Sequence, residues 1–220
     1  MIAKNLISNS VPPLKTSDTG ITAISWLNEF HVHHLPIVNN KEFLGLISED
    51  DILDLNDPQA PIGDHKLAIL RPTVNESQHI YDVMKIASEL KLTLIPVVDD
   101  NEHYLGVITL QDLLDQFTHM ASFREPGGIL MLLINSNDYS FSEIAQIIES
   151  NDAMIMSLYV ATHADSTKME ITIKLNKMDI RHIIASFERY EYNVTGAYQS
   201  ADDTDYLRDR LDSLMNYLNI

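Results

Sequence analysis

The sequence of 220 residues contains no cysteine. That absence excludes disulfide bonds, thiolate metal sites and cysteine nucleophiles, and it is compatible with a reducing compartment. Positive charge is also scarce: 15 Lys and Arg residues stand against 32 Asp and Glu residues, which leaves a formal net charge of -17. A field of that sign repels nucleic acids and anionic lipid surfaces, so we expect neither as a partner.

Long hydrophobic runs are missing as well. Residues 1–14 have no extended apolar core of the kind found in secretory signals. The strongest apolar run, Ile129 to Ile134, has the length of a β-strand rather than of a membrane span. We therefore predict a soluble protein of the cytoplasm. Because 45% of its residues are hydrophobic, it can bury a substantial core, in one large or two to three small compact units.

An internal repeat organises the first half of the chain, and a repeat fixes domain boundaries better than local propensities do. At an offset of 60 residues, five identical pairs coincide: Pro12 with Pro72, Ser17 with Ser77, Glu29 with Glu89, Pro36 with Pro96, and Val38 with Val98. After one inserted residue the offset becomes 61, and five further pairs coincide: Gly45 with Gly106, Ile47 with Ile108, Asp51 with Asp112, Leu53 with Leu114, and Asp54 with Asp115. We infer two copies of one unit, at residues 1–60 and 61–120.

Each copy shows the same order of predicted elements, which is a helix, two strands joined by a polar turn, and a second helix. The turns read Asn-Asn-Lys-Glu and Asp-Asp-Asn-Glu, and both suit antiparallel hairpins. Ser48 and Thr109 have hydroxyl groups suited to capping the second helix. The predicted ranges are 21–30 and 80–90 for the first helices, and 43–47 and 104–108 for the second strands.

With that order, the strings HHLPIVNNKEFLGLISEDDIL and TLIPVVDDNEHYLGVITLQDLL resemble the CBS family over about residues 1–118. The most specific part is Gly-x-h-[Ser/Thr]-x-x-Asp after a strand, where h is apolar, and it occurs twice at matching positions. The resemblance implies that the two units pack about a pseudo-twofold axis into one module with two clefts. CBS modules commonly bind adenosyl ligands there, including AMP, ADP, ATP, cyclic dinucleotides and S-adenosylmethionine.

The duplicated Ser/Thr-x-x-Asp pairs allow two interpretations. One carboxylate can accept hydrogen bonds from both vicinal hydroxyls of a ribose, and a neighbouring Ser or Thr hydroxyl adds a third bond, so Asp51 and Asp112, with Ser48 and Thr109, are candidate ligand contacts. The same side chains also form a capping box, in which they only satisfy the free amides at the start of a helix. Both roles are compatible with one site.

Phosphate groups need cationic or donor-rich partners, which are scarce in this acidic chain. In nucleotide-binding CBS units, a His and a basic residue before the Leu-Pro of the first strand often reach the phosphates, and His33 and His34 hold that place here. The second copy has Thr93 and Leu94 instead, so we expect at most one good phosphate site. The predicted ligand-contacting set is Ser48, Asp51, Thr109, Asp112, His33, His34, Pro36 and Pro96. Arg71 and Lys15 either assist or are solvated surface cations.

The histidines also invite a metal interpretation. On an extended strand His31 and His33 share a face while His34 points away, and no cysteine or second cluster completes a site, so we predict no metal. No nucleophile, Gly-rich phosphate loop or catalytic carboxylate pair stands in a convincing context either. We therefore predict that the protein is not an enzyme.

A change of register at residues 118–126, followed by Gly127-Gly128, indicates a new domain after a linker at 121–128. Strands are predicted at 129–135, 153–161, 169–175 and 192–198, and helices at 141–150 and 180–190. This βαββαβ order is the ferredoxin-like arrangement, which makes the whole chain α+β. With its length of about 70 residues and its place after a CBS pair, the segment 129–200 resembles the ACT family. The combination resembles bacterial CBS-ACT proteins of the acetoin-utilisation accessory type.

Two features of the second half modify that expectation. Many ACT domains bind amino acids at a loop that reads about Asp-x-Pro-Gly, but residues 137–140 have neither the Pro nor the Gly, and Asp138 or Ser140 is well placed to cap the next helix. The final stretch, 201–220, has leucines at helical spacing from Leu207 to Leu218. We expect it to form an amphipathic helix that docks on the ACT-like sheet or, alternatively, on a second subunit.

These observations favour a ligand sensor that binds an adenine nucleotide or a related adenosyl ligand in the CBS clefts. We expect a homodimer whose arrangement depends on whether the ligand is bound, and which acts on an unidentified regulated protein. One alternative is a scaffold for protein interactions whose clefts stay empty. A more remote alternative is an uncharacterised enzyme subunit.

Overall fold

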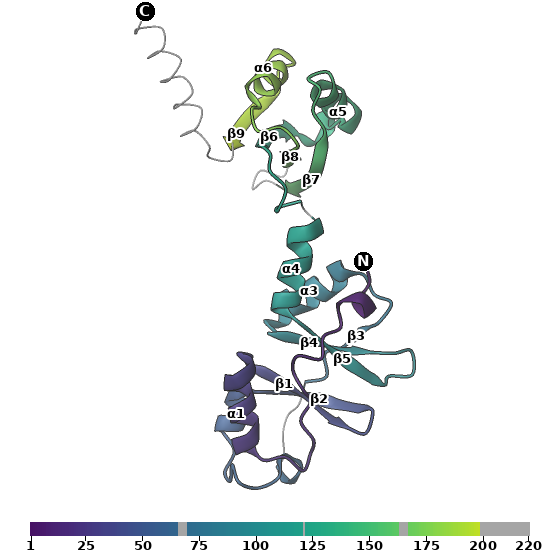
Figure 1. Cartoon of the computed structure of the whole chain (residues 1–220), viewed down its shortest axis with the longest axis vertical. Coiled ribbons are helices and arrows are strands. Elements are labelled where there is room, and N and C mark those ends of the chain that lie inside the picture. The colour runs from purple at the N-terminus through teal and green to yellow at the C-terminus, as the bar shows by residue number, and fades with distance from the viewer. Residues whose placement is uncertain (66–69, 121, 163–166, 199–220) are drawn as a thin grey trace, which may run out of the picture. The chain divides into compact units, whose positions relative to one another are not determined.

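The computed structural model describes residues 1–65, 70–120, 122–162 and 167–198, and the chain divides into two compact units after Gln116 (Figure 1). The predicted C-terminal helix at 201–220 lies outside the described residues. The elements of the first half are η1 Ala3–Leu6, α1 Gly20–Phe30, β1 His34–Asn39, β2 Glu42–Ser48, α2 Glu49–Leu53, η2 Ile62–Asp64, β3 Val74–Asn75, α3 Ile80–Leu90, β4 Leu94–Val98, β5 Tyr104–Thr109 and α4 Leu110–Met120. The helix, strand, strand, helix order predicted for each copy is therefore confirmed.

The two copies share their backbone details. Thr19 and His79 occupy the N-caps of α1 and α3, and each accepts a bond from an amide of the following turn. Both helices end on a left-handed residue, His31 with φ 54° and Lys91 with φ 53°. Each member of these pairs lies 60 residues from its counterpart, so the offset found in the sequence is also the offset of the structure.

The starts of the two copies are exchanged between them. We call these starts the leaders, which are residues 1–11 in the first copy and residues 61–65 with Leu70 in the second. Ser8 bridges Val107 in β5 of the second copy, and its amide donates to the Val107 carbonyl over 2.8 Å. In the opposite direction, the Leu46 amide in β2 of the first copy donates to the Leu70 carbonyl over 2.9 Å. Leu46 and Val107 are equivalent positions at the offset of 61, so the exchange is reciprocal. Directly after the leaders the chain returns to its own copy, since Leu14 pairs with Ile37 of β1 and β3 pairs with β4. The predicted boundaries at 60 and 120 therefore describe the repeat in the sequence, whereas each folded half includes the leader of the other.

Gly106 shows how closely one exchanged leader approaches. Its φ is +151°, and a Cβ atom built there would lie 2.5 Å from Cγ2 of Ile7 in the leader. A side chain at this position would meet both backbone strain and a clash. The glycine of the repeated motif is therefore needed for the leader to lie against β5.

Equivalent residues also touch one another where the two copies meet. The pairs are His33 with Thr93, Glu42 with His103, and Phe43 with Tyr104. The first is a hydrogen bond of 3.0 Å, and the last is a ring stack with centroids 6.3 Å apart. A residue meets its own counterpart only close to an axis of twofold symmetry. The hairpins β1–β2 and β4–β5, which lie side by side in Figure 1, are therefore related by the pseudo-twofold axis that the CBS resemblance implies.

The core of the first half crosses that axis. Leu92, Leu94, Val98 and Val107 of the second copy are buried in one cluster with the side chains of the first copy. A second cluster surrounds β4 and α3, and it includes Ala3 and Leu6 of the N-terminal leader. Neither copy thus has a complete core of its own.

The second half contains β6 Ile129–Asn135, η3 Ser136–Asp138, α5 Phe141–Glu149, β7 Ile155–Thr162, β8 Lys168–Leu175, α6 Arg181–Arg189 and β9 Asn193–Tyr198. The predicted order of strands and helices is the observed order. Its sheet has the antiparallel strand order β7-β8-β6-β9. Both helices lie on one face of this sheet (Figure 1), where Ile144, Ile183 and Phe187 are buried against alternate residues of β6 and β8.

The exchanged leader can be tested by mutating Leu6, which is only 6% exposed and belongs to the core of the second copy. We expect Leu6→Ala to lower the free energy of unfolding by about 2 to 5 kcal/mol, the usual cost of emptying a buried leucine site. Urea denaturation measures the loss, and hydrogen exchange should place it in β4 and β5.

The matched control is Lys4→Ala in the same leader, because the Lys4 side chain is exposed in its ion pair with Glu76. An exposed pair contributes at most about 1 kcal/mol. Equal effects of the two substitutions, or faster exchange confined to the first copy, would contradict the exchange of leaders.

Candidate ligand-binding clefts

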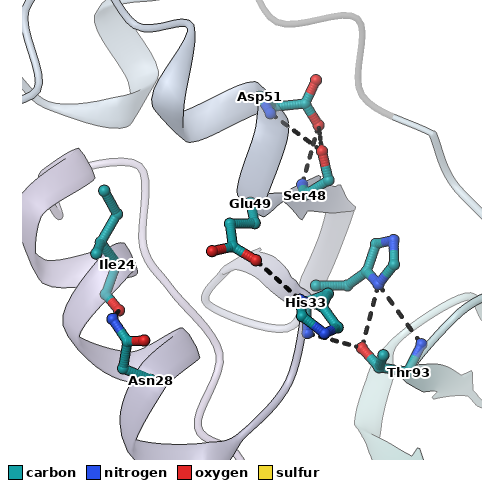
Figure 2. A network of polar contacts seen from close by, with 8 residues as sticks. Ile24, Asn28, His33, Ser48, Glu49, Asp51 and Thr93 are labelled. Carbon is teal, nitrogen blue, oxygen red and sulfur yellow. Dashed lines mark hydrogen bonds and ion pairs between the residues drawn. The ribbon is translucent and has the colours of Figure 1, made fainter.

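A capping box stands at the start of the second helix in each copy, with the same geometry in both. Ser48 Oγ donates to Asp51 Oδ2 over 2.6 Å, and the Asp51 amide donates back to Ser48 Oγ over 3.1 Å (Figure 2). Thr109 and Asp112 repeat these bonds at 2.6 Å and 3.1 Å. The capping interpretation is therefore realised, and such a cap typically contributes about 1 kcal/mol.

The capping box leaves part of each carboxylate unused. Oδ2 of Asp51 accepts from both the amide and the hydroxyl of Ser48, at 2.9 Å and 2.6 Å, and Oδ2 of Asp112 does the same with Thr109. Within the described part of the chain, neither Oδ1 atom accepts a hydrogen bond. An ionised carboxylate oxygen has two lone pairs. Capping and ribose binding are thus compatible, and the ligand role of these residues stays a prediction.

His33 and His34 both contact Thr93, the counterpart of His33 in the second copy, near the pseudo-twofold axis. The His33 amide donates to Thr93 Oγ1 over 3.0 Å, while its ring Nδ1 lies 2.8 Å from Oε2 of Glu49 (Figure 2). His34 Nδ1 lies 3.1 Å from Thr93 Oγ1. In this arrangement the ring of His33 is paired with a carboxylate of the protein, so a phosphate group would compete with Glu49 for it.

Burial lowers the pKa of His34 below its ordinary value of 6.5, because the partly buried ring loses hydration in its charged form. The neighbouring His33 lowers this pKa further, and Asp51 opposes the shift. His34 is therefore neutral near pH 7. It serves as a hydrogen-bonding group for Thr93 rather than as a cation for phosphate.

The hydrogen bonds of Thr93 connect the two capping boxes. Its carbonyl accepts from the amide of Leu110, the first residue of α4. On the opposite side, the His33 carbonyl accepts from the amide of Glu49, the first residue of α2. Thr93 was not among the predicted site residues, although its offset of 60 from His33 was the signal that could have identified it.

A cavity of about 550 Å³ opens beside the second capping box. Its lining consists of Ser8, Ser10, Val11, Phe30, His31, Val32, Thr93, Thr109, Leu110, Gln111 and Asp112. The structure thus brings two predicted residues, Thr109 and Asp112, to one cavity. The leader and the end of α1 supply most of the opposite wall, and neither was predicted from the sequence.

The remaining predicted residues lie elsewhere. Pro36 and Pro96 are buried inside β1 and β4, and Pro96 is not among the residues that line this cavity. Arg71 donates to the carbonyls of Leu44 and Phe43, at 2.7 Å and 3.0 Å, and lines a separate cavity of about 530 Å³. No group of three His, Asp or Glu side chains suited to a metal ion occurs in the described ranges.

The second half has its own cavity of about 390 Å³, near the loop after β6. Ser140 caps α5, as one of the two predicted alternatives, and accepts from the Glu143 amide over 3.3 Å. Asp138 instead accepts from Nδ2 of Asn135. The Tyr192 hydroxyl donates to Glu143, and burial together with this carboxylate raises the pKa of Tyr192 to about 12. The polar groups of this loop are thus largely occupied by one another.

Comparison with known proteins identifies the first half. The family model described as "CBS domain" matches residues 3–56 and again residues 69–119. Residues 3–119 are a tandem pair of CBS domains. The paired capping boxes and the pseudo-twofold axis therefore belong to a CBS pair. In the parts of the chain that the structure describes, no helix is long and apolar enough to cross a membrane.

The curated relatives of this chain include two proteins of one archaeon. An inosine-5'-monophosphate dehydrogenase of Methanocaldococcus jannaschii is 22% identical over 199 residues, which cover 86% of this chain and 39% of that protein. An uncharacterized protein of the same organism is 28% identical over 122 residues, 48% of this chain and 40% of the relative. The chain thus spans about two fifths of the length of these relatives.

Among solved structures, a CBS domain pair/ACT domain protein from Thermotoga maritima is 21% identical with a TM-score of 0.49, and the match covers 54% of this chain and 98% of that one. The CBS domains of a transcriptional regulator from Streptococcus pneumoniae are 21% identical with a TM-score of 0.46, with 52% and 98% covered.

The buried, neutral His34 predicts a pH dependence of stability. Because its pKa in the folded state lies below the unfolded value near 6.5, the unfolded chain binds more protons in that range, and stability falls as the pH drops through 6.5. We expect His34→Gln to reduce the loss of melting temperature between about pH 7.5 and pH 5.5. The exposed His119, changed to Gln, is the control and should leave the loss unchanged. Parallel pH profiles of wild type and His34→Gln would contradict this prediction.

Proposed function

We propose that this protein is a non-enzymatic regulatory sensor of the cytoplasm, which binds an adenine nucleotide or another adenosyl ligand in the clefts of its CBS pair. The observation that carries the proposal is the cavity of about 550 Å³ beside Thr109 and Asp112, into which the second capping box brings a carboxylate with an unused oxygen. The same box recurs at Ser48 and Asp51. Two equivalent acceptors suit two ribose groups.

The chemistry of the second cleft supports an adenosyl ligand in particular. Phe30, Val32 and Leu110 supply apolar surface for a purine ring, while Thr109 and Asp112 supply polar groups for ribose hydroxyls. Ligand pockets of this size typically combine an apolar lining with a few polar groups.

In the first copy we propose that His33 contributes to phosphate binding. Its ring would release the Glu49 carboxylate and pair with the ligand phosphate instead. Its ring is well exposed, with a side-chain exposure of 70%, so the exchange needs no opening of the core. His34 then has a positioning role through Thr93.

We further propose that the second half is an ACT-like domain of the kind found in bacterial CBS-ACT proteins, and that it transmits the ligand state through a homodimer to a regulated protein. Tyr159 and Val160 on the edge strand β7 are 49% and 45% exposed, and an exposed edge strand favours pairing with another chain. Transmission requires that the ligand bind the two states of the dimer with different affinity. The dehydrogenase activity of one relative is not part of this proposal, because the match covers 39% of that protein.

The binding role separates from the capping role in the variants Asp51→Asn and Asp112→Asn. Asparagine keeps one acceptor oxygen for the cap but lacks the charge and the second acceptor. In a thermal-shift panel of adenosine, AMP, ATP, NAD, cyclic dinucleotides and S-adenosylmethionine, a ligand at 100 times its Kd stabilises the folded chain by about 2.7 kcal/mol. We expect each variant to weaken one site while the melting temperature without ligand stays nearly unchanged.

No shift with any member of the panel at millimolar concentration would favour the alternative, a scaffold whose clefts stay empty. Turnover of ATP or AMP that survives both substitutions would instead point to an enzyme.

The phosphate role of His33 has a separate test. We expect His33→Ala to raise the Kd for AMP and ATP about two- to fivefold, the range of an exposed ion pair, and to leave adenosine binding unchanged. Titration calorimetry of the three ligands measures the difference. Equal losses for adenosine and ATP would show that His33 does not contact phosphate.

A further inference from the structure

The wall of the second cleft contains almost no positive charge. Among the residues that line it there is no Lys or Arg in the described part of the chain, and its one carboxylate is Asp112. Among these described lining residues, His31 is the one histidine. The chain as a whole has a formal net charge of -17. A phosphate group entering this cleft would meet a negative field without a cation to offset it.

The amides at the start of α4 do not compensate for the missing cations. A helix N-terminus binds anions through free N–H groups. Here the Thr109 amide donates to Asp112 Oδ2 over 2.9 Å, the Leu110 amide donates to the Thr93 carbonyl over 3.1 Å, and the Asp112 amide donates to Thr109 Oγ1 over 3.1 Å. The capping box and Thr93 thus occupy three of the amides at this helix start, which leaves the Gln111 amide as a single neutral donor and no cation among the described lining residues.

The opposite wall is unfavourable to anions for a different reason. It contains Phe30, His31 and Val32, which are the last residue of α1, its left-handed cap and the residue after it. The carbonyl end of a helix has a partial negative charge, which favours cations. Two walls of the cleft therefore disfavour phosphate, while its apolar surface and its acceptors remain suited to adenine and ribose.

The equivalent positions of the first copy differ in chemistry. At the offsets of 60 and 61, His31 corresponds to Lys91, Thr93 to His33, Leu110 to Glu49 and Gln111 to Asp50. The two copies thus share the ribose-binding pair and differ in the residues around it.

From this geometry we infer that the second cleft selects an adenosyl ligand without a phosphate at the 5' position, of the class represented by adenosine and S-adenosylmethionine. The inference rests on the proposed function and adds the ligand class of one cleft. Asp112 Oδ1 and Thr109 recognise the ribose, and a lining without Lys or Arg among the described residues disfavours a 5' phosphate.

The experiment is titration calorimetry on the full chain with adenosine, S-adenosylmethionine, AMP and ATP. Binding that is lost in Asp112→Asn and kept in Asp51→Asn belongs to the second cleft. For that component we expect a Kd for adenosine or S-adenosylmethionine at least about tenfold below the Kd for AMP, since two walls disfavour the phosphate.

A variant that gains affinity for AMP tests the inference in the opposite direction. Ser10 lines the cleft and is exposed, so Ser10→Arg adds a cation to the wall at little cost in stability. We expect it to lower the Kd for AMP about two- to fivefold, the range of an exposed ion pair, and to change the Kd for adenosine less than twofold. Ser10→Gln is the matched neutral control and should change neither.

Binding of AMP or ATP to the Asp112-dependent site as tight as that of adenosine would overturn the inference while leaving the proposed function standing. So would a Ser10→Arg variant with unchanged AMP affinity. Absence of Asp112-dependent binding for all four ligands would overturn the proposed function for this cleft, and the inference with it.

Discussion

The first half of this protein depends on one constraint, which is that neither copy of the repeat is complete without the other. The leader before each copy lies against the second strand of the opposite copy, with Ser8 on Val107 and Leu70 on Leu46. The cores are shared in the same way, since Leu92 and Leu94 are buried with the first copy. The second cleft follows from this exchange, because its wall combines the leader, the end of α1 and the start of α4.

The order of helices and strands in the first half could be predicted because identical residues recur in the two copies at a nearly constant offset. The offset of 60 aligns the N-caps and the left-handed residues of α1 and α3, and the offset of 61 aligns Gly45 with Gly106 and one capping box with the other. Hydrophobic periodicity predicted most elements, including α3 over Ile80–Leu90 with the observed bounds. The two-residue strand β3 was missed, since so short a segment has no periodicity.

The exchange of leaders and the partners of the histidines could not be predicted, because both depend on contacts between distant parts of the chain. The resemblance to CBS units implied a phosphate role for His33, but it could not show that Glu49, 16 residues away, lies 2.8 Å from the His33 ring. Pro36 and Pro96 are buried within strands, which their place in the motif did not show, and their contact with a ligand stays a prediction. Thr93 was overlooked because a threonine has no distinctive signal until its neighbours are known.

The exchanged leaders have a consequence for a chain that contains only one copy of the unit. Such a half-length chain would have a leader without a strand to lie on, and it could bury that leader only by associating with a second chain. Its clefts would then exist only above the dissociation constant of the pair. Fusion of two copies replaces this encounter by an intramolecular one, at an effective concentration set by the connecting segment. The fused chain therefore keeps its clefts at any dilution.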